Sequence, residues 1–368
     1  MFQNIKVTIP TENIGSIPRP KELIDNINSF KNGMISKEQM DKAYEESIKD
    51  TIEKLKKCGC SVVTDGEQLK PSFLTYPISG SAQCEDNGLE ITFSDGHKRS
   101  VPILSSLIQP PFKYKTYAKE YIDNARKYTD LPIKQSVISV SAMSLLYPSV
   151  SINNYSREQF IKDMLNEVER DIRMCLEAGA QTVTIDCTEA RLALKLDPSG
   201  DLLKQFIKLN DQVLTRFSPE ELKRIGIHSC PGADHDSTHS MEVDYCRILL
   251  PSLLQLPVGK FYLEFAAESN KQDIILCISK NIRPEQIIFF GVTNVNDPRI
   301  ETPEEIRDML LEIYKYIPIE QFGSCDDCGF SPFFDDLSTS RDIAFAKIDA
   351  RIKGTKLAEE IINKHLNE

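Results

Sequence analysis

The feature that most constrains the fold of this chain is a repeated alternation of short apolar runs with longer amphipathic segments. The apolar runs are IKVTIP (5–10), SVVTDGE (61–67), PIKQSVISV (132–140), QTVTIDC (181–187), IGIHSC (225–230), KFYLEF (260–265), QIIFFGV (286–292) and IEQFGS (319–324). Each run is short, apolar and often β-branched, as expected of a strand that is buried on both of its faces. The sequence therefore predicts eight buried strands.

Segments with helical periodicity lie between these strands. The clearest spans residues 36–59, with Ser36 placed to cap its start and Gly59 placed to end it. Further helices are predicted at 157–179, 201–217, 273–280 and 303–316. Eight strands, each followed by a mostly helical connection, predict an α/β fold, a (β/α)8 TIM barrel formed as a single domain by residues 1–368. The alternative is a doubly wound sheet, with helices on both faces of an open sheet.

The chain is longer than such a barrel needs. It has 368 residues, whereas a barrel of this type typically takes about 250. We expect the surplus in the region around 11–35 and in an insertion at about 71–130. Within the insertion, LEITFSDGHKRSVPIL (89–104) predicts a β-hairpin that turns around residues 94–96.

Composition limits the partners and the location of the protein. A net charge of -11 argues against a general nucleic-acid binder, because neutralising phosphates requires a basic face. No apolar run approaches the length of a membrane span, and the N-terminus MFQNIKVTIP lacks the apolar block of a signal peptide. The ten cysteines are scattered and do not resemble a secreted disulfide framework. We therefore expect a cytoplasmic protein with reduced thiols that acts on small molecules, without nucleic-acid or membrane partners.

Polar side chains cluster at the predicted strand ends, where barrels carry their chemistry. In chain order these are Ile14-Gly15-Ser16, Asp65-Gly66-Glu67, Asp186, His228 with Cys230, Glu264, residues 294–297, and Cys325 with Cys328. An isolated buried carboxylate is costly unless it is paired or bound to a cation. A rim that gathers carboxylates, thiols and an imidazole therefore indicates a site.

The spacing His228-x-Cys230 indicates a metal site. Side chains two apart on a strand point to the same side, so both can reach one ion. With Cys328 and Glu264 they form a set of two thiols, one imidazole and one carboxylate, which suits tetrahedral Zn²⁺. We take His228, Cys230 and Cys328 as the firm ligands, and Glu264 as a fourth that a substrate thiol could displace. Glu268 is the competitor for that fourth place.

Other interpretations of these residues stay open. Cys325-Asp-Asp-Cys328 also fits a redox pair, but such pairs usually open a helix in a thioredoxin-like unit, and this one follows the last strand of a barrel pattern. His235 and His239 lie four apart in a Gly/Asp/Ser-rich loop, where a solvated surface is the plainer interpretation. Either histidine is also a candidate proton carrier beside the metal, and we assign His235 that catalytic role.

Two thiolates and one imidazole make zinc a poorer activator of water than three imidazoles do, because the sulfurs donate charge to it. Such a site suits a third thiol, since a coordinating thiol is deprotonated outright and becomes a strong nucleophile at neutral pH. The residues thus predict zinc-dependent alkylation of a thiol. Glu67 and Asp186 are then candidates to bind an ammonium group, and backbone N–H groups at Gly15-Ser16 to bind a carboxylate. The plain alternative for each is a capped turn.

Seven segments resemble, in order, the C-terminal catalytic barrel of the cobalamin-independent methionine synthase family. They are IGSIPRP (14–20), VTDGE (63–67), TID (184–186), HSC (228–230), YLEF (262–265), GVTNVNDPRIETPEEI (291–306) and DDCGF (326–330). The resemblance implies a zinc barrel that methylates homocysteine in methionine biosynthesis. By motif, it implies that the zinc ligands are His228, Cys230, Glu264 and Cys328. It also implies that Ile14, Gly15, Ser16, Glu67 and Asp186 hold the amino acid.

Three departures from the family pattern bear on the methyl donor. The N-terminal barrel of the long enzymes has no counterpart here, and the chain has no tryptophan to stack on a pterin. Asn294 and Asn296 stand where the family places an Asp and a His that handle a proton, and asparagine cannot act as a general acid. We keep Asn296 with His235 as predicted catalytic residues, and expect a methyl-folate or a methyl-corrinoid as donor. The alternatives are an epoxide–thiol transferase and a non-catalytic, zinc-stabilised barrel.

Overall fold

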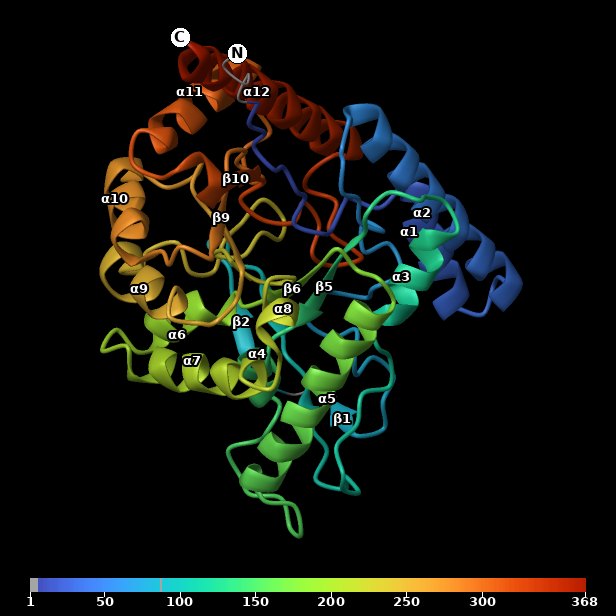
Figure 1. The fold of residues 1–368 in the computed structure, drawn as a ribbon. Coiled ribbons are helices and arrows are strands. Elements are labelled where there is room, and N and C mark those ends of the chain that lie inside the picture. Colours follow the sequence, from blue (N-terminus) through green and yellow to red (C-terminus); the bar gives the residue numbers. More distant parts are fainter. Residues whose placement is uncertain (1–5, 87) are drawn as a thin grey trace.

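The computed structural model describes residues 6–86 and 88–368, which build a ring of strands inside a ring of helices (Figure 1). Six parallel strands pair in the order of the chain: β5 (Lys134–Ile138), β6 (Thr182–Asp186), β7 (Ile225–Ser229), β8 (Lys260–Leu263), β9 (Ile287–Gly291) and β10 (Phe322–Cys325). Five of them lie within runs predicted from the sequence, and β10 extends one residue beyond the predicted run 319–324. Almost every residue in the six strands is buried, as expected of strands covered on both faces.

Two extended segments complete the ring between β10 and β5. Glu12 donates its N–H to the Ser324 carbonyl, 3.1 Å away, and Val63 bridges to Ile133 of the β5 side. The two segments join each other where Ile17 N–H meets the Gly66 carbonyl at 3.0 Å. The first two predicted strands are therefore bridges rather than full strands, and Ile5 lies outside the described residues. Pro10 has no N–H to donate, which shortens the pairing here.

Helices form the outer layer. They are α1 (Lys21–Lys31), α2 (Lys37–Cys58), α3 (Lys119–Arg126), α4 (Val140–Ser144), α5 (Arg157–Glu177), α6 (Glu189–Leu196), α7 (Asp201–Leu214), α8 (Pro219–Leu222), α9 (Leu250–Leu253), α10 (Lys271–Asn281), α11 (Pro303–Tyr314) and α12 (Arg341–Asn367). A π-helical turn (Tyr245–Leu249) precedes α9, and a 3-10 turn (Ile319–Gln321) precedes β10. The prediction for 36–59 is confirmed: Ser36 and Gln39 form a capping box, and Gly59 ends the helix at φ 90°.

The last helix, α12, was not among the predicted segments. Its buried face carries Lys347, Arg351 and Thr355 among the apolar residues, which interrupts the apolar stripe that would reveal it. It packs against α11 and contacts the N-terminal segment, where Asn363 Oδ1 accepts the Val7 N–H at 2.7 Å. Figure 1 shows α12 running across one side of the barrel beside α11.

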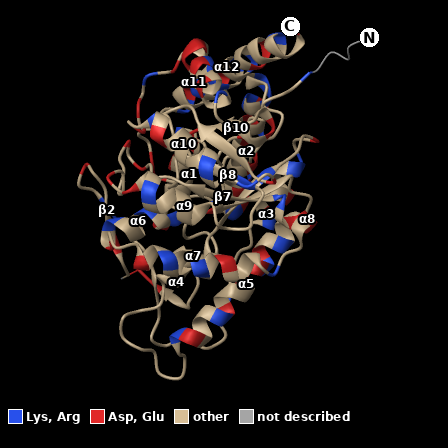
Figure 2. Ribbon diagram, turned by 60° about the vertical axis from the view of Figure 1, so that its left-hand side comes forward, with Lys and Arg blue, Asp and Glu red and all other residues tan. Residues whose placement is uncertain are grey.

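The insertion at 71–130 carries two small antiparallel sheets outside the barrel. In one, β1 (Cys84–Glu85) pairs with β4 (Ile103–Leu104); in the other, β2 (Glu90–Thr92) pairs with β3 (Lys98–Ser100). The predicted hairpin is therefore confirmed. β2 overlaps the barrel in Figure 1 and lies at the edge of the molecule beside α6 in Figure 2, and the Ser94 N–H donates to the Thr238 carbonyl at 2.7 Å, so the hairpin covers one end of the barrel.

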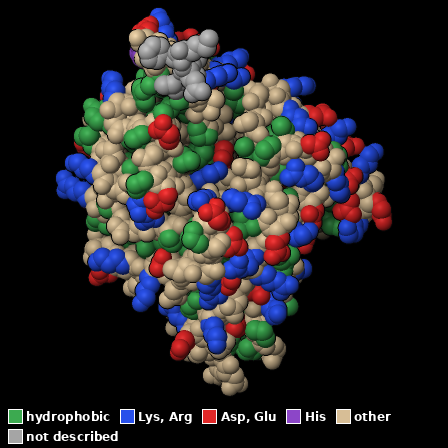
Figure 3. All heavy atoms as spheres, in the orientation of Figure 1, with side chains coloured by type: hydrophobic (Ala, Val, Ile, Leu, Met, Phe, Trp, Pro, Cys, Tyr) green, Lys and Arg blue, Asp and Glu red, His purple; other side chains and the backbone are tan. Residues whose placement is uncertain are grey.

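Surface charge is mixed in sign. Lys and Arg alternate with Asp and Glu along the helices (Figure 2), and both kinds are interspersed on the face shown in Figure 3. Within the described ranges, no helix combines the length and the apolar character needed to cross a bilayer.

Candidate metal and substrate site

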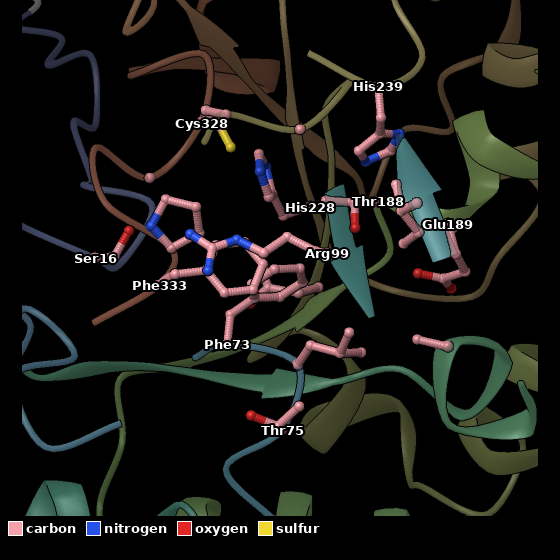
Figure 4. A pocket seen from close by; sticks show the side chains of 18 of the residues that line it. Ser16, Phe73, Thr75, Arg99, Thr188, Glu189, His228, His239, Cys328 and Phe333 are labelled. Atoms are coloured by element: carbon pink, nitrogen blue, oxygen red, sulfur yellow. The ribbon is translucent and has the colours of Figure 1, made fainter. Parts of the chain in front are cut away.

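A cavity lies at the carboxyl ends of the barrel strands, beneath the β2–β3 hairpin (Figure 4). It contains about 970 Å³ of empty space, including its opening to solvent. The barrel strands and the segments that follow them contribute Ile14, Gly15, Ser16, Glu67, Ser136, Asp186, Thr188, Glu189, His228 and Cys328. The hairpin and the neighbouring loops contribute Phe73, Ile91, Phe93, Arg99, His239 and Phe333. The cavity is thus polar where the barrel strands end and aromatic where the insertion covers it.

Three predicted metal ligands come together at the polar end. The ligand atoms of His228, Cys230 and Cys328 all lie within 4.8 Å of one another, and all three residues are buried. The two sulfurs are 2.8 Å apart, and both cysteines are free. His228 and Cys230 share one side of β7 and its extension, as their spacing predicted, whereas Cys328 arrives in the loop after β10. Figure 4 shows the His228 ring and the Cys328 sulfur facing each other.

The imidazole of His228 is oriented so that its Nε2 can bind a cation. Its Nδ1 lies 3.1 Å from the Tyr262 carbonyl, which can only accept, so Nδ1 carries the proton. In the neutral ring Nε2 is an acceptor, and it is buried with no hydrogen-bond partner among the described residues. An unpaired buried acceptor beside two thiols is costly unless a cation binds there. The donor set therefore fits zinc, with a carbonyl fixing the tautomer of its histidine ligand.

The two thiols differ in acidity. Burial opposes ionisation of Cys230, but a hydrogen bond from Cys328 and the charge of His228 lower the pKa of Cys230 well below its ordinary value. The hydrogen bond to Cys230, together with burial, raises the pKa of Cys328. Cys230 is therefore the more acidic of the two thiols when no cation is bound. A cation would favour ionising both, so its binding should release a proton.

Glu264 and Glu268 share a buried arginine. Glu264 Oε2 lies 3.3 Å from Nη2 of Arg191, and Glu268 Oε1 lies 2.6 Å from the same nitrogen. Glu264 is therefore turned toward Arg191 and stands outside the group of three ligands within 4.8 Å. Burial raises the pKa of Glu264, although the Arg191 charge opposes this.

The predicted substrate-binding residues line the same cavity as the metal group. Gly15 lets the backbone approach Glu67, because a Cβ there would lie 3.0 Å from Glu67 Oε1 and 2.9 Å from Ser136 Oγ. Lys70 pairs with Glu67 Oε1 at 2.9 Å. Burial raises the pKa of Asp186 to about 7, against the opposing charge of His228. Two carboxylates and a backbone turn thus face a cavity that also contains thiols and an imidazole.

Neither His235 nor Asn296 is among the described residues that line the cavity. His235 is 44% exposed and meets Arg99 at 3.2 Å. It stands near Asp234 and Asp336 in a second group of possible metal ligands, but the Asp234 carboxylate there already forms an ion pair with Arg99. Asn296 donates its N–H to Asn294 Oδ1 at 3.0 Å. The catalytic roles of His235 and Asn296 remain predictions.

His239 is the loop histidine that reaches the cavity. It is buried, its Nδ1 lies 2.6 Å from Ser240 Oγ, and its ring packs edge-on against Phe93. Burial and the charges of Lys195 and Arg191 lower its pKa to about 4, so His239 is neutral at pH 7.

Several residues of the site were not predicted from the sequence. Lys70 stands three positions after Glu67 and Arg191 five positions after Asp186, so each is near a predicted residue. Spacing alone did not single them out, because their roles depend on which carboxylate they meet. Phe93, Arg99 and Phe333 had no such signal, since the hairpin and the loop after β10 meet only in three dimensions.

Comparison with known proteins agrees with this architecture. Residues 9–335 match the family model described as cobalamin-independent synthase, catalytic domain. The methionine synthase of Saccharolobus solfataricus is 22% identical over 361 residues, covering 97% of this chain and 96% of that protein. The methionine synthase of Sulfurisphaera tokodaii is 25% identical over 365 residues, covering 98% and 95%.

Two solved structures share the fold. A B12-independent methionine synthase from Shewanella sp. W3-18-1, in complex with selenomethionine, superposes with a TM-score of 0.72 at 18% identity, covering 98% of this chain and 99% of that one. A putative vitamin-B12-independent methionine synthase from Listeria monocytogenes gives 0.68 at 18% identity, covering 96% and 98%. With the parallel sheet described above, these likenesses confirm the predicted barrel.

Proposed function

The chain belongs to the cobalamin-independent methionine synthase family and is therefore a methyltransferase; from that premise we propose that it uses zinc to methylate the thiol of homocysteine, forming methionine. One observation carries the proposal. His228 Nε2 is buried and unpaired beside two free thiols, in the cavity that Glu67 and Asp186 also line.

The proposed zinc ligands are His228, Cys230, Cys328 and Glu264. When bound to such a set, zinc lowers the pKa of a substrate thiol, so that the thiolate predominates at neutral pH. Glu264 is the replaceable member of the four, because its carboxylate also has a cationic partner within reach, Arg191 at 3.3 Å.

The proposed role of Glu67 and Asp186 is to bind the ammonium group of homocysteine. Lys70 pairs with Glu67 at 2.9 Å, and a bound ammonium would lower the pKa of Asp186 from about 7. The backbone at Ile14, Gly15 and Ser16 would bind the substrate carboxylate. Together these contacts would fix the direction in which the thiol enters the metal group.

The proposed methyl donor is a methyl-folate or a methyl-corrinoid. Phe73, Phe93 and Phe333 give the cavity an aromatic wall suited to a flat donor, in a chain without tryptophan. We regard the chain as one barrel domain whose insertion at 71–130 excludes water from the cavity. Ten free cysteines suit a reducing compartment, so the proposed location is the cytoplasm.

X-ray absorption at the zinc edge tests the proposal, recorded before and after addition of L-homocysteine. We expect the shell to change from two sulfurs to three, and expect methionine to form when methyl-folate or methylcobalamin is supplied. If the number of sulfur ligands around zinc does not change on adding L-homocysteine, the metal is structural and the proposal is refuted. Turnover of the thiol with epoxides, and none with methyl donors, would replace it with an epoxide–thiol transferase.

A further inference from the structure

Arg191 is a buried cation whose hydrogen-bonding capacity is only partly used. Its side chain is fully buried, and its guanidinium lies 4.0 Å from the centre of the Tyr245 ring. Nη2 donates to Glu268 at 2.6 Å, whereas Nε and Nη1 have no hydrogen-bond partner among the described residues. A guanidinium offers five N–H donors in a planar fork, so Arg191 has room for a second carboxylate.

Glu264 has a fixed backbone and a less restrained carboxylate. Asp327 accepts the N–H groups of Phe265, Ala266 and Ala267, at 2.8 to 2.9 Å, and so holds the turn that follows Glu264. Tyr245 donates its hydroxyl to the Glu264 carbonyl at 3.1 Å. The Glu264 Oε2 atom is buried, lies 3.3 Å from Arg191, and makes no hydrogen bond among the described residues. Movement of Glu264 is therefore confined to its side chain.

We propose that Arg191 and Glu268 form a receiving site for Glu264, which holds its carboxylate whenever a substrate thiol takes its place in the metal group. This rests on the proposed function. Arg191 is then a positioning residue that sets the balance between two locations of Glu264: with His228, Cys230 and Cys328, or with Arg191.

The role of Glu268 follows from charge balance. A buried cation without a partner is strongly unfavourable, so Arg191 needs a carboxylate while Glu264 is with the metal group. Glu268 lies 2.6 Å from Arg191 in this structure and would supply that carboxylate in either state. When Glu264 returns, the fork of the guanidinium has donors for both carboxylates. Glu268, the sequence-based competitor for the fourth ligand position, is on this view the counter-ion of Arg191.

Two variants should change homocysteine binding in opposite directions. In Arg191→Met the receiving site is lost, so Glu264 stays with the metal group and the Kd for L-homocysteine should rise roughly tenfold or more. In Glu268→Gln the guanidinium loses its other carboxylate and attracts Glu264 more strongly. Its Kd for L-homocysteine should fall roughly tenfold, and zinc affinity without thiol, measured by chelator competition, should fall as well.

The measurement uses the zinc-loaded full chain, with the thiol-dependent sulfur count from X-ray absorption beside the calorimetric Kd. In a Glu264→Gln background, Arg191→Met should no longer change the Kd, because the carboxylate it receives is gone. Glu301→Gln is the matched control for Glu268→Gln. Glu301 is a buried carboxylate that pairs with buried Lys347 at 2.9 Å, away from the cavity, and should leave both affinities unchanged.

The outcomes separate the two proposals. If the wild-type zinc shell does not respond to homocysteine, the proposed function fails and this inference with it. If the wild type responds, but Glu268→Gln weakens homocysteine binding or matches Glu301→Gln, the receiving site alone is refuted. If Arg191→Met does not fold, Glu268→Gln in the Glu264→Gln background decides the question: the receiving site predicts no further change in the Kd, whereas Glu268 as the fourth ligand predicts that the change persists and would refute the receiving site.

Discussion

The β2–β3 hairpin should open when Arg99 is removed, because Arg99 ties it to the barrel. Arg99 Nε lies 2.6 Å from Asp234 Oδ2, and Nη2 lies 3.1 Å from Oδ1, so the pair is bidentate. The side chain of Asp234 is fully buried in the loop after β7, and the hairpin places Phe93 in the wall of the cavity. In Arg99→Met this carboxylate keeps only weaker partners, which include His97 at 2.9 Å.

The size of the effect follows from these contacts. Hydrogen bonds between charged groups each contribute about 1.5–3 kcal/mol, and breaking a buried ion pair costs more because it leaves the partner charge buried and unpaired. The Arg99 side chain is 22% exposed, which reduces that figure, and its second partner Asp335 is 43% exposed and adds little. We expect the closed hairpin to lose about 2–3 kcal/mol, a roughly 30- to 150-fold rise in its opening equilibrium.

Native-state hydrogen exchange measures this opening directly. The reporters are two hairpin amides bonded to the loop after β7: the Ser94 amide donates to the Thr238 carbonyl at 2.7 Å, and the Asp95 amide donates to Ser237 Oγ at 3.1 Å. Amides of β6 and β7 should keep their protection, because the barrel does not depend on Arg99. The control is Lys98→Met on the same strand, since Lys98 and Glu90 are both more than half exposed and their pair contributes little. Hairpin exchange in Arg99→Met within twofold of that in Lys98→Met would refute the reasoning.

Three further predictions concern acidity and space around the cavity. Burial lowers the pKa of His97, but its hydrogen bonds to Asp234 and Asp95 outweigh this and raise it. At pH values below the ordinary pKa of histidine, protonated His97 therefore helps to hold the hairpin closed, and this contribution is lost as pH rises through the raised pKa. Exchange of the Ser94 amide, which donates to the Thr238 carbonyl, should accelerate over that range beyond its intrinsic pH dependence. Gly15→Ala should raise the KM for homocysteine roughly tenfold with little change in Tm, because the new Cβ would lie 3.0 Å from Glu67 Oε1; an unchanged KM would contradict the assigned contact. With the pKa of Asp186 near 7, binding of L-methionine, which has no thiol to titrate, should strengthen as pH rises through about 7 in the metal-free protein, and calorimetry on Asp186→Asn should show a flat profile.

Local sequence was sufficient wherever a residue's role follows from its own strand. β5 to β10 are buried on both faces, yet their sequences mix polar with apolar residues, as in KQSVI for β5 and TVTID for β6. The apolar and β-branched residues predicted the strands, and the polar residues at the ends of the runs marked the rim of the barrel. His228 and Cys230 were paired because side chains two apart share one side of a strand. The first two strands were predicted as full strands, but Pro10 and the turn at Gly66 reduce their pairing to single bridges.

By itself, then, the sequence determined the alternation that forms a barrel, the strand ends that bear chemistry, and the residue types that suit a metal and an amino acid. Only the tertiary structure decided which buried charges meet. Glu264 turns to Arg191, Glu67 pairs with Lys70, and His239 rather than His235 enters the cavity. The physical reason is that periodicity reports the direction of a side chain relative to its own backbone, whereas an ion pair depends on the distance between two segments that the chain brings together only on folding.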